Sequence, residues 1–115
     1  MTDKQPHDLL DETIHQRTRL AIMATLTGVE SLEFNELKAQ LSLTDGNLST
    51  HLAALERAGY VEITKDFENK KPRTTAAMTA KGRTAMGKYV SLLQGILARA
   101  AQPRRPKGDW TDGVM

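Results

Sequence analysis

The stretch from Leu43 to Gly59, LTDGNLSTHLAALERAG, constrains the fold most, because it combines a helix start, one apolar stripe and a helix stop. Thr44 and Asp45 are favourable capping residues, since a short side-chain oxygen can accept the first free backbone N–H groups. Gly59 readily adopts the left-handed conformation that ends many helices. We predict a helix over residues 45–58, with a core-facing stripe at helical spacing made of Leu48, Leu52 and Leu55.

The other face of this predicted helix carries small or polar side chains and, beyond Asp45, no acidic group in its first turns. These residues are Gly46, Asn47, Ser49, Thr50 and His51. A helix that packs on leucines and presents short hydrogen-bonding side chains can lie close to base edges in a DNA major groove. Ordinary surface helices share this pattern, so the neighbouring segments must distinguish the two readings.

Length and composition indicate one small domain. The chain has 115 residues and no cysteine, which excludes disulfides and thiolate metal sites. It contains no apolar run of about 18 residues, so no transmembrane helix is predicted. The N-terminal sequence MTDKQPHDLLDE is polar and acidic, unlike a signal peptide. We therefore expect a cytoplasmic protein with no membrane association.

The net charge of +2 conceals an asymmetry along the chain. Residues 1–45 hold four Lys/Arg against eight Asp/Glu, whereas residues 46–115 hold twelve against six. The basic part thus begins at the helix described above. Such a distribution suits a polyanionic partner, although basic segments are also common as solvated faces or tails.

The residues before this helix predict further helices. Apolar positions indicate one helix from Leu9 to about His15 and a second from Gln16 to Leu26, or a single bent helix. Residues 29–33 form a connector with at most one short strand. A short helix follows over 33–40. Two short helices joined by a tight apolar turn are the helix-turn-helix arrangement.

After Gly59 the apolar period changes to two, so residues 60–78 are expected to form a β-hairpin with a basic tip at 66–73. Thr79 then caps a last, long helix, and residues 101–115 form a tail. We expect the apolar side of the last helix to pair with a second copy and with the N-terminal helix; folding back on its own domain is the alternative. The predicted homodimer interface consists of Leu9, Leu10, Ile14, Tyr89, Leu93, Ile96 and Leu97.

The runs FNELKAQLSLTDGNLSTHLAALERAGYVEI and KKPRTTAAMTAKGR resemble winged-helix transcriptional regulators of the broad MarR/ArsR type, and especially a small winged-helix DNA-binding family. The likeness extends from about residue 15 to residue 89. Met78 stands where leucine is usual, a swap that conserves volume. The resemblance implies an α+β, mainly α fold: a three-helix core, a β-hairpin wing and terminal dimerisation helices. The implied segments are an N-terminal arm (1–14), the winged helix (15–79), a dimerisation helix (80–99) and a flexible tail (100–115).

The resemblance also implies a site for double-stranded DNA. The residues expected to face the bases are Asn47, Ser49, Thr50 and His51, and those expected to contact phosphates, partly through the wing at 64–74, are Thr44, Arg57, Lys65, Lys70, Lys71 and Arg73. Phosphate contacts supply affinity and position, and base contacts supply sequence choice. His51 is equally compatible with packing. Arg17 and Arg19 are compatible with either phosphate contacts or intrachain ion pairs.

Other functions find less support in the sequence. The three histidines are widely spaced, so no metal or cofactor is expected, although Asp11 and His15 could contribute to a weak site. No cysteine nucleophile, glycine-rich phosphate loop or H-E-x-x-H motif indicates an enzyme. A small-molecule effector is compatible with the family but not identified; Met23, Met78 and Met86 suit either a small pocket or the core. We expect a dimeric repressor on a palindromic operator, with a protein–protein interaction module as the alternative.

Overall fold

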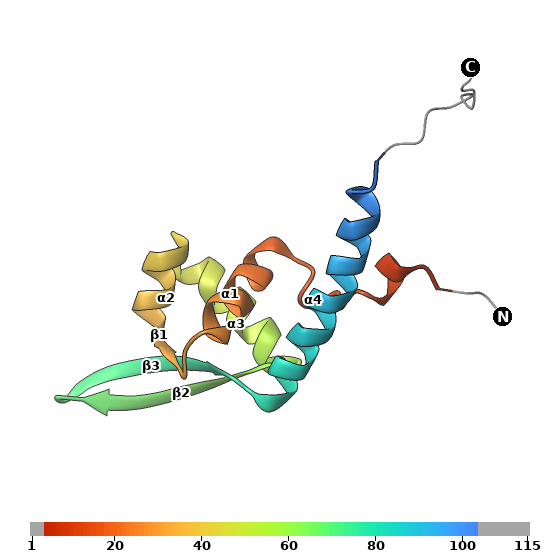
Figure 1. Cartoon of the computed structure of the whole chain (residues 1–115). Coiled ribbons are helices and arrows are strands. Elements are labelled where there is room, and N and C mark those ends of the chain that lie inside the picture. The colour runs from red at the N-terminus through yellow and green to blue at the C-terminus, as the bar shows by residue number, and fades with distance from the viewer. Residues whose placement is uncertain (1–3, 104–115) are drawn as a thin grey trace, which may run out of the picture.

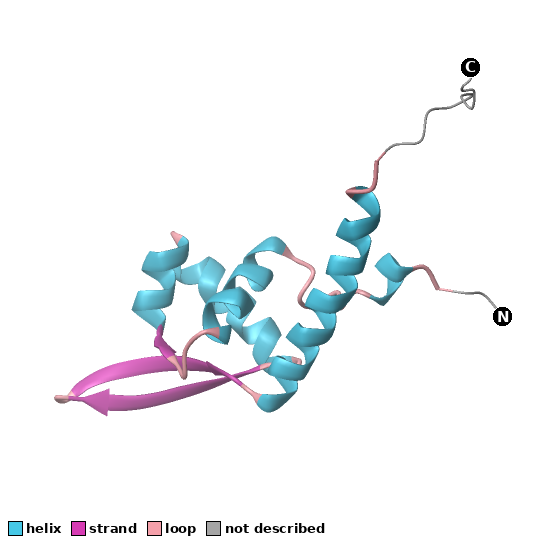
Figure 2. Ribbon diagram, viewed as in Figure 1, coloured by secondary structure: helices cyan, strands magenta, loops and turns pink. Residues whose placement is uncertain are grey.

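The computed structural model describes residues 4–103, and the part of the predicted tail from residue 104 onward lies outside them. Figure 1 shows a helical body with a long hairpin projecting from one end and the last helix rising from the other, and Figure 2 distinguishes the helices from the strands. In chain order the elements are a 3-10 turn η1 (Pro6–Leu9), α1 (Arg17–Thr27), β1 (Leu32–Glu33), α2 (Phe34–Leu41), α3 (Asp45–Arg57), β2 (Val61–Glu68), β3 (Lys71–Met78) and α4 (Ala80–Ala100).

The predicted helix-turn-helix is confirmed as α2 and α3. Ser42 ends α2 in the left-handed conformation, with φ of 55°, and the Leu43 N–H then donates to the Lys38 carbonyl at 3.0 Å. A short turn therefore joins α2 to α3, and Leu43 in this turn is half-buried. α1 completes the three-helix body and contacts both α2 and α3.

The predicted helix from Leu9 to His15 is wrong. Pro6–Leu9 form a 3-10 turn, and Leu10 follows in an extended conformation. The Asp11 carboxylate then accepts the backbone N–H groups of Thr13 (2.9 Å) and Ile14 (3.3 Å). A side chain that bonds nearby N–H groups in this way offers the backbone an alternative to a helix. The apolar residues of this segment therefore pack from an irregular turn and not from a regular helix.

The predicted hairpin is confirmed, but its strands are longer and its turn shorter than expected. β3 lies between β1 and β2 in an antiparallel sheet, with Leu32 opposite Ala76 and Val61 opposite Met78. The ladder continues to Glu68 opposite Lys71. Asn69 and Lys70, with φ of 52° and 68°, make a two-residue turn of the kind that matches strand twist. Neither residue is glycine, so the position of this two-residue turn within the predicted tip at 66–73 was not evident in the sequence.

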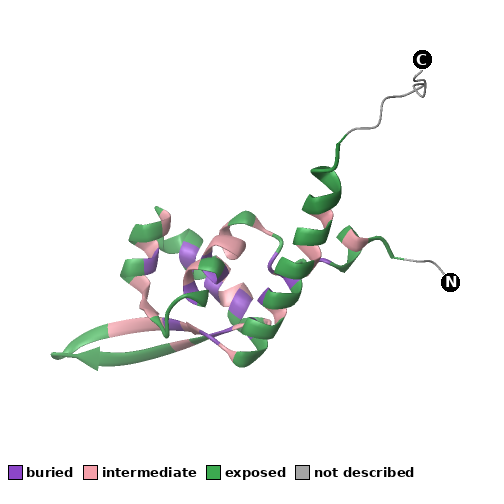
Figure 3. Cartoon of the chain, in the orientation of Figure 1, coloured by how far each residue is buried: buried purple, intermediate pink, exposed green. Residues whose placement is uncertain are grey.

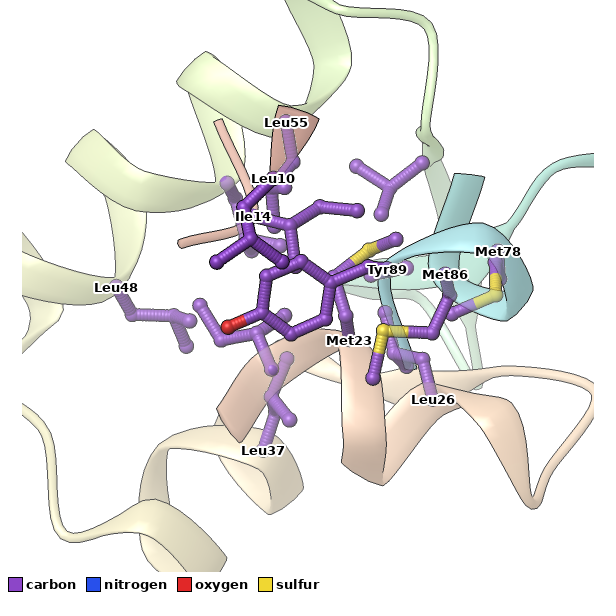
Figure 4. Close-up of a cluster of buried hydrophobic side chains, with 14 residues drawn as sticks. Leu10, Ile14, Met23, Leu26, Leu37, Leu48, Leu55, Met78, Met86 and Tyr89 are labelled. Carbon is purple, nitrogen blue, oxygen red and sulfur yellow. The ribbon is translucent and has the colours of Figure 1, made fainter. Parts of the chain in front are cut away.

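One hydrophobic core connects the N-terminal segment, the three-helix body, the sheet and the first half of α4. Its buried residues lie where these elements meet (Figure 3). The Tyr89 ring of α4 is central, among labelled side chains that include Ile14 and Met23 (Figure 4). Met23, Met78 and Met86 are all buried in this cluster, so they fill the core. The segment boundaries given above remain a prediction.

Two tyrosine hydroxyls attach the N-terminal segment to the rest of the domain. The Tyr60 hydroxyl, just after α3, donates to the Asp11 carboxylate, and this bond with burial raises the pKa of Tyr60 to about 12. The Tyr89 Oη lies 2.7 Å from His15 Nδ1. Asp11 and His15 thus both form hydrogen bonds with tyrosines.

Among residues 4–103 no cluster of three or more possible metal ligands occurs, and no helix there has the length and apolar character needed to cross a membrane.

Candidate nucleic-acid interface

α3 is held by its apolar face and capped at both ends. The Thr44 hydroxyl accepts the Asn47 N–H at 3.1 Å, a cap of the kind that contributes about 1 kcal/mol. Gly59, with φ of 82°, ends the segment as predicted. The three core-facing leucines are at most 4% exposed. The opposite face of the helix therefore stays at the surface, in a fixed orientation.

The exposed face of α3 is centred on Thr50. At about 100° per residue, Thr50 points almost directly away from the leucine stripe, and Arg57 lies two turns further along the same face. Asn47 and Ser49 flank this line, and all four residues are exposed. Short side chains at the centre allow a close approach to base edges. The structure thus brings Asn47, Ser49 and Thr50 to one surface, and their role in base reading stays a prediction.

His51 differs from these residues because it is half-buried beside α1. Its Nδ1 lies 3.3 Å from Nη1 of Arg19. Arg19 in turn donates from Nε to the Thr13 carbonyl at 2.5 Å. Burial and the neighbouring guanidinium lower the pKa of His51 below its usual value. Both effects favour the neutral form of the His51 imidazole, and Arg19 makes contacts within its own chain.

The one acidic residue in the first turn of α3 forms an ion pair with a lysine of α2. Asp45, the first residue of α3, accepts from Lys38 Nζ of α2 at 2.6 Å. A free carboxylate here would repel phosphate, and the lysine counters that repulsion. The sequence did not predict this ion pair, because its two residues lie seven positions apart on either side of a turn.

The register divides the wing residues between two faces of the hairpin. Lys65 and Phe67 alternate with Asp66 along β2, so they share the face that carries Val61 and Ile63. Lys65 lines a groove of about 640 Å³ between α3 and the hairpin, opposite Ser49 and Glu56. Phe67 is 73% exposed near the tip. Lys65, Lys70 and Lys71 are exposed, as a phosphate-contacting role requires.

Arg73 is engaged within the wing itself. Its Nε and Nη2 donate to the two carboxylate oxygens of Asp66 at 3.1 and 3.2 Å, and its Nη1 donates to Glu68 at 3.0 Å. These bonds raise the pKa of Arg73 and lower the pKa of Asp66. A phosphate would have to compete with two carboxylates for this guanidinium. The lysines of the wing are therefore better placed than Arg73 to contact DNA.

The residues predicted for the dimer interface differ in their exposure within a single chain. Leu10, Ile14 and Tyr89 are at most 9% exposed within a single chain, because they form part of its own core. They have little surface left for a partner. Leu9 and Leu97 are about half exposed, while Leu93 and Ile96 are half-buried. Val90 of α4 adds to the exposed apolar surface.

A three-helix body, an outward-facing second helix of a helix-turn-helix and a β-hairpin beside it define a winged helix protein. Residues 18–97 match the winged helix DNA-binding domain family, and the chain belongs to that family. This confirms the resemblance seen in the sequence and identifies the exposed face of α3 and the wing as the surface to test for DNA binding.

The chain is also similar to individual proteins. An uncharacterised protein of Methanocaldococcus jannaschii is 46% identical over 72 residues, which make up 63% of this chain and 78% of that protein. A transcriptional regulator homologue from Pyrococcus horikoshii OT3 has a similar structure, with a TM-score of 0.76 and 28% identity over 80% of this chain and 91% of its own. A protein from Enterococcus faecalis V583, assigned to the MarR family of transcriptional regulators, has a TM-score of 0.70 and 27% identity over 86% and 90%.

Proposed function

We propose that this protein is a homodimeric transcriptional repressor that binds a palindromic operator. Two copies of α3, about one DNA turn apart, would enter successive major grooves, and each wing would contact the adjoining phosphates or minor groove. The observation that carries the proposal is the exposed face of α3, with its short side chains, beside a hairpin that bears three exposed lysines. Occupation of the operator would block the promoter. Membership of a DNA-binding family and similarity to a transcriptional regulator homologue support it.

The proposed roles in base and phosphate contact follow from side-chain chemistry. Asn47 and Thr50 can donate and accept hydrogen bonds at base edges, where each good contact contributes about 1–3 kcal/mol of discrimination. Lys65, Lys70 and Lys71 carry charge to the phosphates and release counterions without regard to sequence. Arg57 lies on the outward line of α3 and is suited to a phosphate at the edge of the groove.

The test measures binding of the purified protein to its own upstream DNA and to a scrambled duplex of equal length. Fluorescence anisotropy at two salt concentrations reports the binding. We expect tight, salt-sensitive binding that prefers the upstream sequence, with a symmetric footprint. The double variant Asn47→Ala/Thr50→Ala should lose most of the preference while retaining salt-sensitive binding. Lys88→Ala, which removes a charge from α4, is the control and should change neither property.

A folded dimer that bound neither duplex at either salt concentration would contradict the proposal. That result would favour the alternative, a winged helix that docks on another protein. An asymmetric footprint with sequence preference intact would retain the DNA-binding regulator but reject the palindromic operator.

A further inference from the structure

The contact between Arg19 of α1 and His51 of α3 lies outside the roles described above. It joins the first helix of the domain to the helix expected to read DNA, over 32 positions of sequence, with a distance of 3.3 Å between Arg19 Nη1 and His51 Nδ1. The Thr13 carbonyl holds the other edge of the same guanidinium at 2.5 Å. Arg19 is therefore bound on two sides, and both it and His51 are half-buried.

This contact decides which imidazole nitrogen carries the proton. A guanidinium has five N–H donors and no acceptor. His51 Nδ1, which faces Arg19, must therefore accept. In a neutral imidazole the proton then resides on Nε2, which becomes a hydrogen-bond donor. The contact with Arg19 thus fixes one tautomer of His51, in which Nδ1 accepts and Nε2 donates a hydrogen bond.

A donor on Nε2 of His51 would lie at the edge of the exposed face of α3. His51 follows Thr50 directly and lies one turn after Asn47, at the edge of the exposed face nearest α1. In the major groove, guanine presents two adjacent acceptors, N7 and O6, while adenine N7 and thymine O4 are single acceptors and cytosine presents the N4 amino donor. An N–H donor is therefore matched best by guanine, matched less well by adenine or thymine, and repelled by cytosine.

We propose that His51 reads a guanine in the major groove through Nε2–H, and that Arg19 is the positioning residue that fixes this tautomer. The inference rests on the proposed function and assigns a specificity role to a residue of α1, outside the helix-turn-helix. Arg19 acts through His51 and need not contact DNA itself.

The tautomer can be measured on the free protein by long-range ¹H–¹⁵N NMR of the imidazole rings. We expect the His51 signals of a neutral ring with the proton on Nε2. His7 and His15 in the same sample serve as references, since His7 is exposed and His15 contacts Tyr89. A His51 ring protonated on Nδ1, or a mixture of tautomers in the unaltered chain, would overturn the proposal without any binding experiment.

The reading role is tested by base substitution in the operator. His51→Ala and Arg19→Met should each lose preference at the same base pair of each half-site, by about tenfold, the lower range for one base contact. Arg17→Met, which removes the same charge from an exposed position of α1, should leave the preference unchanged. Circular dichroism and thermal melting verify that each variant is folded.

The possible outcomes separate this inference from the proposed function. If Arg19→Met weakened binding to all duplexes equally and preserved the preference, Arg19 would be a phosphate contact and the positioning role would be wrong. If the unaltered protein bound no DNA, the proposed function would fail and the reading role with it. The NMR result would still show whether Arg19 sets the tautomer.

Discussion

At the scale of single residues, the junction between α3, the sheet and α4 depends on a residue without a side chain. The Thr79 hydroxyl accepts the Gly82 N–H at 2.9 Å and donates to the Gly59 carbonyl at 2.6 Å. The Thr79 N–H donates to the Tyr60 carbonyl at 3.0 Å. The first turn of α4 therefore lies directly on the backbone that leaves α3. This close approach is possible because position 82 has no Cβ atom.

We predict that Gly82→Ala destabilises the protein. A Cβ at this position would lie 2.2 Å from the Tyr60 carbonyl oxygen, which is backbone and cannot move aside cheaply. Overpacking of this kind costs about 1–3 kcal/mol. Urea denaturation followed by circular dichroism measures the change in the free energy of unfolding.

Gly95→Ala is the matched control for that substitution. It lies in the same helix, and its added Cβ would meet nothing within 4 Å. Alanine is favoured over glycine in helices by about 1 kcal/mol, so this variant should be as stable as the original chain or more so. Equal, neutral effects of the two substitutions would contradict the importance of the close approach at Gly82.

At the scale of elements, local patterns in the sequence predicted the regular parts of the fold and missed the long-range contacts. α3 was predictable because its cap, its leucine stripe and its terminal glycine are all local signals. The segment at 9–15 was not, because its apolar spacing suits a helix while the Asp11 side chain bonds the N–H groups of Thr13 and Ile14.

The candidate site shows the same division. The exposure of Asn47, Ser49 and Thr50 follows from helical periodicity alone. The Arg19–His51 contact joins two helices, and the pairing of Arg73 with Asp66 requires the register of a hairpin whose turn contains no glycine. Charge type was visible in the sequence; the partner of each charge was not.

The pairing within the wing leads to a prediction for this element. Lys70→Ala/Lys71→Ala should weaken binding to every duplex. Each lost phosphate contact removes about 0.9 from the slope of log K against log salt, so the slope should fall by about 1.8 per protomer and about 3.6 per dimer. Asp66→Asn/Arg73→Met removes one charge of each sign and keeps the net charge of the wing. It should leave the salt slope close to that of the original protein. Binding titrations over a series of salt concentrations measure both.

A reduced slope for Asp66→Asn/Arg73→Met would show that Arg73 leaves its carboxylate partners when DNA binds. An unchanged slope for the double lysine variant would show that the wing does not contact phosphates. Thermal melting of both variants excludes loss of the hairpin as the cause.

At the scale of the whole molecule, α4 and α3 are connected through the common core and the Thr79 contacts. Tyr89 of α4 is buried in the common core, and Thr79 attaches the start of α4 to the end of α3. The N-terminal segment contacts α4 and bonds to Tyr60 through Asp11. A change of angle between two copies of α4 would therefore change the separation of the two α3 helices, which is how a dimer of this architecture could be regulated.

We expect the second half of α4 to supply the surface for the predicted dimer. Val90, Leu93 and Leu97 recur at spacings of three and four, so they form one stripe along the helix. Val90 is 38% and Leu97 56% exposed in a single chain. Leu97 is large, apolar and outside the buried core, so its substitution should affect association and leave the monomer fold intact.

We predict that Leu97→Glu shifts the protein from dimer to monomer at micromolar concentration, because it would place two carboxylates in an apolar interface without partners. Sedimentation velocity measures the association, and Arg99→Glu, an exposed change in the same last turns of α4, is the control. The monomer should lose tight binding to a palindromic duplex while keeping weak binding to a half-site, since only one α3 can then dock. A dimer unaffected by Leu97→Glu would place the interface elsewhere, and a monomeric unaltered protein would reject the two-fold arrangement altogether.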